Sequence, residues 1–228
     1  MLGQKKKISR KEIKEDRLVT FYYEAIALFE EHKKNILIGA GALAVIILAF
    51  VLYTNNKMAD NEIANVELGR VISLYDSGSF MEAIEGKPGT NVIGFKKIVE
   101  MYGSTENGEI AKIYLANSYY ALGKFDEAEK YYDDYSGGID LFKSTALAGL
   151  AACKEAKEDF KSAAELYMKA AKITEENVLN PKYLVLAGIN LLHSDNKSQA
   201  KEIFTQVKKD FAKSAYIREV DRYLSQSE

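Results

Sequence analysis

The stretch "YLANSYYALGKFDEAEKYYDDY", residues 114–135, decides the fold class of this 228-residue chain. It contains two runs of mostly helix-forming residues, separated by a short turn around Gly123. Glycine is favoured directly after a helix because it adopts a left-handed backbone at little cost. The stretch therefore predicts a helix, a tight turn and a second helix.

Two later stretches repeat this pattern: "LAGLAACKEAKEDFKSAAELYMKAA", residues 147–171, and "LVLAGINLLHSDNKSQAKEIFTQV", residues 184–207. An alanine follows each turn, at Ala128, Ala163 and Ala200, with spacings of 35 and 37 residues. These spacings are close to the 34-residue period of tetratricopeptide repeats, in which helix pairs stack on one another. The sequence predicts an all-α fold whose main domain is a tetratricopeptide-repeat (helix-turn-helix) solenoid.

A less regular unit, "NVELGRVISLYDSGSFMEAIEG", precedes these repeats and ends in the Gly/Pro-rich break "GKPGTNVIG". We expect the break to be a surface linker between helices, and a functional lid is the alternative. The predicted segments are a basic amphipathic tail (1–35), a transmembrane helix (36–53) and a tetratricopeptide domain (55–228), the last comprising a degenerate unit (61–105), repeats at about 109–142, 144–177 and 181–214, and a capping helix (215–226).

The apolar stretch "ILIGAGALAVIILAFVLY", residues 36–53, has 18 residues and no charge. As a helix it would span about 27 Å, close to the thickness of a bilayer's hydrocarbon core. A soluble core helix of this length would have a polar face. A signal peptide would have a shorter apolar region followed by a small-residue cleavage site. We therefore expect an uncleaved membrane anchor with a single span.

The charge on either side of this stretch predicts its orientation. Residues 1–35 hold nine Lys/Arg and six Asp/Glu, whereas residues 54–228 hold 22 and 27. The positive-inside rule places the N-terminus in the cytoplasm and the C-terminal domain across the membrane. For a bacterial inner membrane, that side is the periplasm. The negative charge of the main domain argues against nucleic acid as its partner.

The N-terminal tail has an apolar face of its own. Ser9 followed by Glu12 is a capping-box pattern that predicts the start of a helix. The helix would carry its apolar residues on one side: Leu18, Phe21, Tyr22, Ala25, Leu28 and Phe29. A basic amphipathic helix can lie on an anionic membrane surface, which is the position we expect. Docking on the cytoplasmic face of a partner is the alternative.

The first helix of each repeat lines the concave surface of such a solenoid. The residues expected there form a candidate partner-binding groove: Ile113, Asn117, Tyr120, Ala148, Ala152, Glu155, Val185, Ile189 and Leu192. This mostly apolar set suits an amphipathic helix or an unfolded apolar segment. Packing against a neighbouring helix of the same chain is the alternative. Some tetratricopeptide domains bind a C-terminal carboxylate with lysine and asparagine, but Ile113 stands where the lysine would be, so we do not expect that mode.

Residue types that support catalysis are sparse. There is no nucleophile–base set, no pair of carboxylates in an apolar context and no phosphate-binding loop. The single cysteine, Cys153, excludes an intramolecular disulfide, and the two histidines, His32 and His193, are too far apart in sequence for a zinc motif. The sequence predicts no enzyme, no cofactor, no metal site and no small-molecule substrate.

The order of these segments, together with "YGSTENGEIAKIYLANSYYALGKFDEAEKYY" (residues 102–132), resembles the YfgM-like family of membrane-anchored tetratricopeptide proteins ancillary to the Sec translocon. The resemblance implies a periplasmic scaffold on the bacterial inner membrane. It also implies contacts with the Sec channel, with periplasmic chaperones and with unfolded exported chains. The alternative is a structural subunit of another cell-envelope membrane complex.

Overall fold

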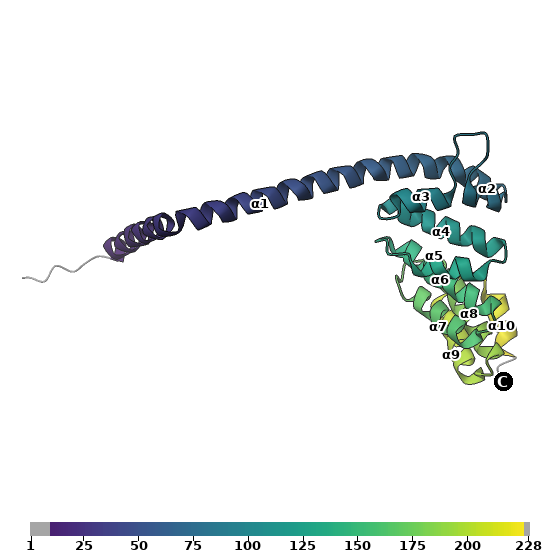
Figure 1. The fold of residues 1–228 in the computed structure, drawn as a ribbon. Coiled ribbons are helices and arrows are strands. Elements are labelled where there is room, and N and C mark those ends of the chain that lie inside the picture. Colours follow the sequence, from purple (N-terminus) through teal and green to yellow (C-terminus); the bar gives the residue numbers. More distant parts are fainter. Residues whose placement is uncertain (1–9, 226–228) are drawn as a thin grey trace, which may run out of the picture. The chain divides into compact units, whose positions relative to one another are not determined.

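The computed structural model describes the backbone of residues 10–225 and the side chains of residues 19–225. Within this range the chain is all-helical, with ten helices and no strand. The helices are α1 (Arg10–Asp76), α2 (Phe80–Glu85), α3 (Phe95–Tyr102), α4 (Glu106–Ala121), α5 (Phe125–Asp133), α6 (Asp140–Ala156), α7 (Phe160–Ala171), α8 (Asn180–His193), α9 (Lys197–Asp210) and α10 (Ile217–Leu224) (Figure 1). The predicted cap at Ser9, the rest of residues 1–9 and residue 226 of the predicted capping helix lie outside the described residues.

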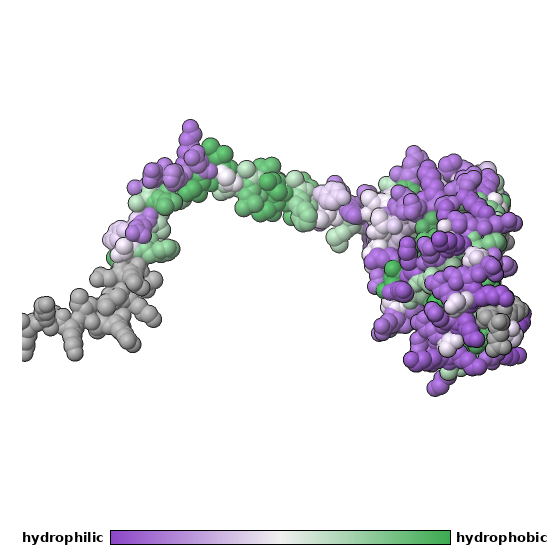
Figure 2. Space-filling view, turned by 90° about the horizontal axis from the view of Figure 1, so that it is seen from below, coloured by the Kyte–Doolittle hydropathy of each residue, from purple (hydrophilic) through white to green (hydrophobic). Residues whose placement is uncertain are grey.

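The chain divides into two compact units, Met1–Asn56 and Lys57–Glu228, and α1 begins in the first and ends in the second. In the first unit, every side chain from residue 36 to residue 53 is exposed. Figure 2 shows this part of α1 as a mostly hydrophobic surface, in green. The core helix of a soluble protein would bury such a surface, but no part of this one is buried. Among the described residues, the chain thus has one helix that is long and apolar enough to cross a membrane.

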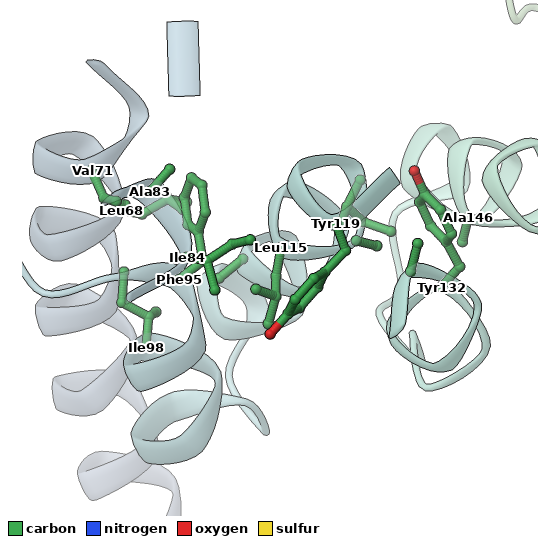
Figure 3. Close-up of a cluster of buried hydrophobic side chains, with 14 of the residues drawn as sticks. Leu68, Val71, Ala83, Ile84, Phe95, Ile98, Leu115, Tyr119, Tyr132 and Ala146 are labelled. Carbon is green, nitrogen blue, oxygen red and sulfur yellow. The ribbon is translucent and has the colours of Figure 1, made fainter. Parts of the chain in front are cut away.

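In the second unit, the helices from α2 to α10 pack against one another in chain order (Figure 1). The first of three buried clusters joins the end of α1 to the helices that follow it. Figure 3 shows Leu68 and Val71 of α1 beside Phe95 and Ile98 of α3. The end of the apolar helix is therefore also the first helix of the packed domain.

Four turns in this domain have the same backbone geometry. The turn residue, two positions after the end of each first helix, has a positive φ: 77° at Gly78, 72° at Gly123, 61° at Glu158 and 59° at Asp195. The N–H of this residue donates to the carbonyl three positions before it. The N–H of the residue that follows donates to the carbonyl five positions before itself. This pair of bonds is the Schellman motif, which satisfies carbonyls that a helix end leaves free. The sequence shows the turn glycine in two of these units, at Gly78 and Gly123, and lacks it in the other two.

The four turns place equivalent residues in equivalent packing positions. The alanine five residues after each turn residue is fully buried: Ala83, Ala128, Ala163 and Ala200. A small side chain at this point lets the two helices of a pair approach closely. Four residues further along, the second helix carries a buried aromatic side chain in three of the four units: Tyr132, Tyr167 and Phe204. These rings fill the space toward adjacent helices, and the Tyr132 and Phe204 rings lie against Gly149 and Gly188 respectively.

The first unit fits this register once residues 86–93 are set aside. The turn residues are 45, 35 and 37 positions apart, and omitting these eight residues reduces the first interval to 37. Phe95 then occupies the aromatic position, and it is fully buried. The two ends of segment 86–93 lie next to each other, because Gly86 and Ile93 form an isolated antiparallel bridge. We call this segment the excursion: it is an insertion in the second helix of the first unit, which α2 and α3 share.

Candidate functional site

The nine predicted groove residues occupy three equivalent positions in α4, α6 and α8, which lie ten, six and three residues before the turn residue. The structure divides them by accessibility. Ile113 and Val185 are only 2% exposed and pack in two different buried clusters. Their inclusion in an accessible groove is therefore wrong. The alternative of packing within the chain holds for these two, because a branched aliphatic side chain at this position reaches the neighbouring helices.

The position three residues before the turn remains accessible. Its occupants are half-buried or exposed in all four units: Tyr75, Tyr120, Glu155 and Leu192. We call these four residues the first-helix strip. Tyr75 was absent from the predicted groove, because the excursion obscured the first unit. Its position three residues before Gly78, like that of Tyr120 before Gly123, is the signal that could have found it.

Asn117 is held by tyrosines of its own chain. The Tyr132 hydroxyl donates to Asn117 Oδ1 at 2.5 Å, and the Asn117 side chain also hydrogen-bonds Tyr75. Burial raises the pKa of Tyr132 far above its ordinary value, so this hydroxyl keeps its proton and stays a donor. Burial raises the pKa of Tyr75 as well, and the bond to Asn117 opposes that rise. With its oxygen and one of its two N–H donors engaged, Asn117 has only one N–H left for a carboxylate.

Glu155 has a similar buried tyrosine beneath it. The hydroxyl of Tyr167, which is 3% exposed, donates to Glu155 Oε2 at 3.0 Å. Tyr167 and Tyr132 are 35 residues apart and occupy the same position in consecutive units. Burial and the Glu155 carboxylate together raise the pKa of Tyr167, so that it too remains a donor. These two buried hydroxyls thus fix one polar side chain on α4 and one on α6.

The remaining predicted residues are apolar and partly exposed. Ala148 and Ala152 on α6 pack against the third buried cluster, and Ile189 and Leu192 on α8 pack against the second. Each keeps some surface accessible to solvent. The accessible part of the predicted set is therefore a mixed surface, with aromatic and polar residues on α4, small apolar and acidic residues on α6, and larger apolar residues on α8.

Two cavities of the domain lie away from the predicted groove. One of about 530 Å³ lies between α7, α8 and α9 and is lined by Met168, Leu184, Ile203 and Phe211 among others. Another, of about 360 Å³, lies beside the excursion. None of the nine predicted residues lines either cavity. No residue of the first-helix strip lines these two cavities, and an extended, accessible helix face suits a macromolecular partner better than a small molecule.

A buried ion pair stabilises the start of α4 without exposing reactive groups. Lys112 Nζ lies 2.9 Å from Glu109 Oε1 and 2.9 Å from Asp134 Oδ2, and Glu109 also accepts from the N–H and hydroxyl of Ser136. These contacts attach the α5–α6 loop to α4. Because every charge has a partner of opposite sign and several hydrogen bonds, we interpret the cluster as structural.

The thiol of Cys153 is fully buried, and burial raises its pKa to about 11. Such a thiol is protonated near neutral pH and inaccessible to substrates. Across the described part of the chain, no group of three or more His, Cys, Asp or Glu side chains could hold a metal ion. Neither the family models nor the curated proteins contain a match to this sequence. The geometry of the domain therefore carries the functional argument.

Proposed function

We propose that the second unit is a tetratricopeptide-type scaffold that binds segments of other proteins. The observation that carries the proposal is the fourfold register of the turns, in which Gly78, Gly123, Glu158 and Asp195 share one backbone geometry. A buried alanine follows each turn at the same distance. Helix pairs repeated in this way present their first helices as one extended binding surface. The partly exposed tyrosines of the first-helix strip suit such a role, since tyrosine is enriched at interfaces.

The scaffold is proposed to be anchored in the bacterial inner membrane by residues 36–53, with its N-terminus in the cytoplasm and its domain in the periplasm. The exposure of the whole apolar stretch supports the anchor. The orientation rests on the charge difference across it, with Lys33 and Lys34 directly before the stretch. A tether of this kind raises the concentration of the binding surface near the membrane.

The proposed partners are the Sec channel, periplasmic chaperones and exported chains that have not yet folded. This proposal rests on the resemblance to YfgM-like proteins and on the mixed apolar and aromatic surface of α4, α6 and α8. Unfolded segments expose apolar side chains that such a surface can cover. A scaffold next to the channel exit would bring these segments and the chaperones together. In this account the protein binds and does not catalyse.

The proposal is tested by identifying what the full-length protein contacts in cells. Chemical crosslinking in intact cells, extraction in mild detergent and affinity capture would be followed by mass spectrometry. We expect the Sec channel and periplasmic chaperones to be recovered. The variants Tyr120→Ala and Ile189→Asp should reduce recovery of chaperones or clients, whereas Thr205→Ala, on the exposed side of α9, should leave it unchanged.

Recovery of one other membrane complex at constant ratio, without the channel, would contradict this assignment. That result would make the protein a structural subunit of a different envelope assembly. Recovery of no specific partner by the wild-type protein would contradict the scaffold function itself.

A further inference from the structure

Glu155 differs from the other shielded carboxylates of the domain. Among the residues whose side chains are described, six Asp or Glu residues are buried or half-buried: Glu67, Glu82, Glu109, Glu129, Glu155 and Glu219. Five of them lie within 4.0 Å of a Lys or Arg nitrogen. Among the described side chains, no Lys or Arg nitrogen lies within this distance of Glu155. The neighbouring bases Lys154 and Lys157 bind Glu129 instead.

The carboxylate of Glu155 is held in place by a hydrogen bond that engages only one of its acceptor sites. Its Oε2 accepts from the buried Tyr167 hydroxyl, and no other group in the described part of the chain hydrogen-bonds its side chain. Its Oε1 is not among the fully buried atoms that lack a partner, so solvent reaches it. A carboxylate can accept about four hydrogen bonds. Glu155 therefore presents a fixed negative charge with free acceptor sites at the surface.

Tyr120 supplies an aromatic ring on α4, near enough for the Glu155 charge to act on its hydroxyl. It occupies the same position on α4 as Glu155 does on α6, and these two helices are in contact. The ring is 37% exposed and lies against Phe125, with 5.3 Å between the ring centroids. Burial, and then the nearby Glu155 charge, raise the pKa of Tyr120. An exposed aromatic ring next to an unpaired carboxylate is the combination that attracts an ammonium or guanidinium group.

Several residues near this pair are apolar. Ala152 lies one turn before Glu155 on α6, and Ala156 follows it directly. On α8, Leu192 occupies the position equivalent to Glu155, with Ile189 one turn before it. A segment bound along the strip would thus meet an aromatic ring and a carboxylate on α4 and α6 and apolar side chains on α8. Asn117, the residue that would favour a carboxylate ligand, is partly engaged by Tyr75 and Tyr132.

We propose that Tyr120 and Glu155 form a subsite for a single Lys or Arg side chain of an otherwise apolar protein segment bound along the first-helix strip. This inference rests on the proposed scaffold function and adds the charge preference of its partner. The basic side chain would stack on the Tyr120 ring and pair with Glu155 Oε1. The surface would then select basic apolar segments over acidic ones.

The test compares the affinities of three peptides for the full-length protein in detergent or in nanodiscs. The peptides share a 15-residue apolar sequence with a central lysine, norleucine or glutamate, and binding is read by fluorescence anisotropy. Norleucine keeps the length of the lysine side chain and removes its charge. We expect the lysine peptide to bind about fivefold more tightly than the norleucine peptide, and the glutamate peptide most weakly. Added salt should reduce the lysine preference.

Two substitutions localise the effect. Glu155→Gln keeps an acceptor for the Tyr167 hydroxyl and removes the charge, so the lysine and norleucine peptides should bind it equally. Glu165→Gln removes an exposed carboxylate from α7 and should leave the lysine preference intact. Thermal unfolding of both variants would verify that each is folded. Because the peptide comparison on the wild-type protein needs no substitution, it decides the question even if a variant fails to fold.

Equal binding of the lysine and norleucine peptides to the wild-type protein would overturn the subsite while leaving the scaffold function in place. An equal loss of lysine preference in Glu165→Gln would also overturn it, because the preference would then reflect general charge. Failure of all three peptides to bind would contradict both the subsite and the binding of apolar segments proposed above.

Discussion

At the scale of single residues, two of the repeated turns hold a non-glycine residue in a backbone conformation that is unfavourable for it. Glu158 and Asp195 adopt the left-handed backbone that Gly78 and Gly123 adopt in the other two units. Aspartate tolerates this region better than glutamate, because its short side chain can hydrogen-bond locally. The geometry is kept because the surrounding helices fix the turn.

We predict that Glu158→Gly stabilises the protein by about 0.5–1 kcal/mol, since the relief of left-handed strain exceeds the extra backbone entropy of glycine. Chemical denaturation of the full-length protein in detergent would measure the change. Glu165→Gly is the matched control, because it places the same substitution inside α7, where it should destabilise by about 1 kcal/mol. A destabilisation of similar size in both variants would contradict the strain at Glu158.

Glu129 provides a second residue-scale prediction, which concerns pH. Hydrogen bonds from Lys154 and Lys157 hold the pKa of Glu129 below its ordinary value. A carboxylate with a lowered pKa stabilises the folded state above its unfolded pKa of about 4.3, and this stabilisation is lost as the pH falls through the folded pKa. We expect Glu129→Gln to cost about 0.5–1 kcal/mol near neutral pH and the difference from wild type to shrink below about pH 4.

The measurement is the free energy of unfolding as a function of pH. Glu127→Gln in the same helix is the control, since Glu127 is exposed and makes no ion pair with a described residue. It should change stability little at any pH. A pH-independent loss in Glu129→Gln would show that packing, and not charge, is responsible.

At the scale of elements, the excursion at residues 86–93 explains why the first unit looks degenerate in sequence. Its two ends meet at the bridge between Gly86 and Ile93, and Lys87 N–H donates to Val92 O at 3.1 Å. A side chain at Gly94 would collide with the carbonyl of Ile84, so the chain can close here only with glycine. The helix path continues on either side in the register of the other units.

Removal of residues 86–93 should therefore leave the domain folded. We expect the deletion variant to keep its helical content and cooperative unfolding, with a lower melting temperature because Val92 and Ile93 no longer pack on the first buried cluster. Circular dichroism of the purified full-length protein would measure both. Deletion of residues 111–118, also eight in number, is the control, because it removes buried Ile113 and Leu115 and should abolish cooperative unfolding. Equal damage from the two deletions would contradict the insertion.

The helices themselves were predictable, and their contacts were not. Ala128, Ala163 and Ala200 revealed three helix pairs through their spacing alone. The partners of Asn117 and Glu155 lie 15 and 12 residues away on the second helix of each pair. Which side chains meet there depends on how closely the helices cross, and periodicity does not specify that. The burial of Ile113 and Val185 has the same origin.

At the scale of the whole molecule, the exposed apolar stretch precedes the repeat domain, and the proposed orientation puts the two ends of the chain on opposite sides of the membrane. If the orientation is correct, protease added to intact spheroplasts will degrade residues 57–228 and spare the N-terminal tail. The physical reason is the excess of basic residues before the span. Detection with an N-terminal and a C-terminal epitope would follow both ends.

A charge-exchange variant controls this topology experiment. Lys33→Glu and Lys34→Glu combined with Asn55→Lys and Asn56→Lys reverses the local charge bias, and the C-terminal domain should then become partly protected. A wild-type domain that resists protease until the membrane is permeabilised would contradict the orientation.

The central claim is that the first-helix strip binds other proteins, and site-specific photo-crosslinking in living cells tests it most directly. A photoreactive phenylalanine analogue would replace Tyr120 in the strip or Thr205 on the exposed side of α9, in the full-length protein. The account predicts defined polypeptide adducts from position 120 and none from position 205. Adducts of equal yield at both positions, or none at position 120, would contradict it.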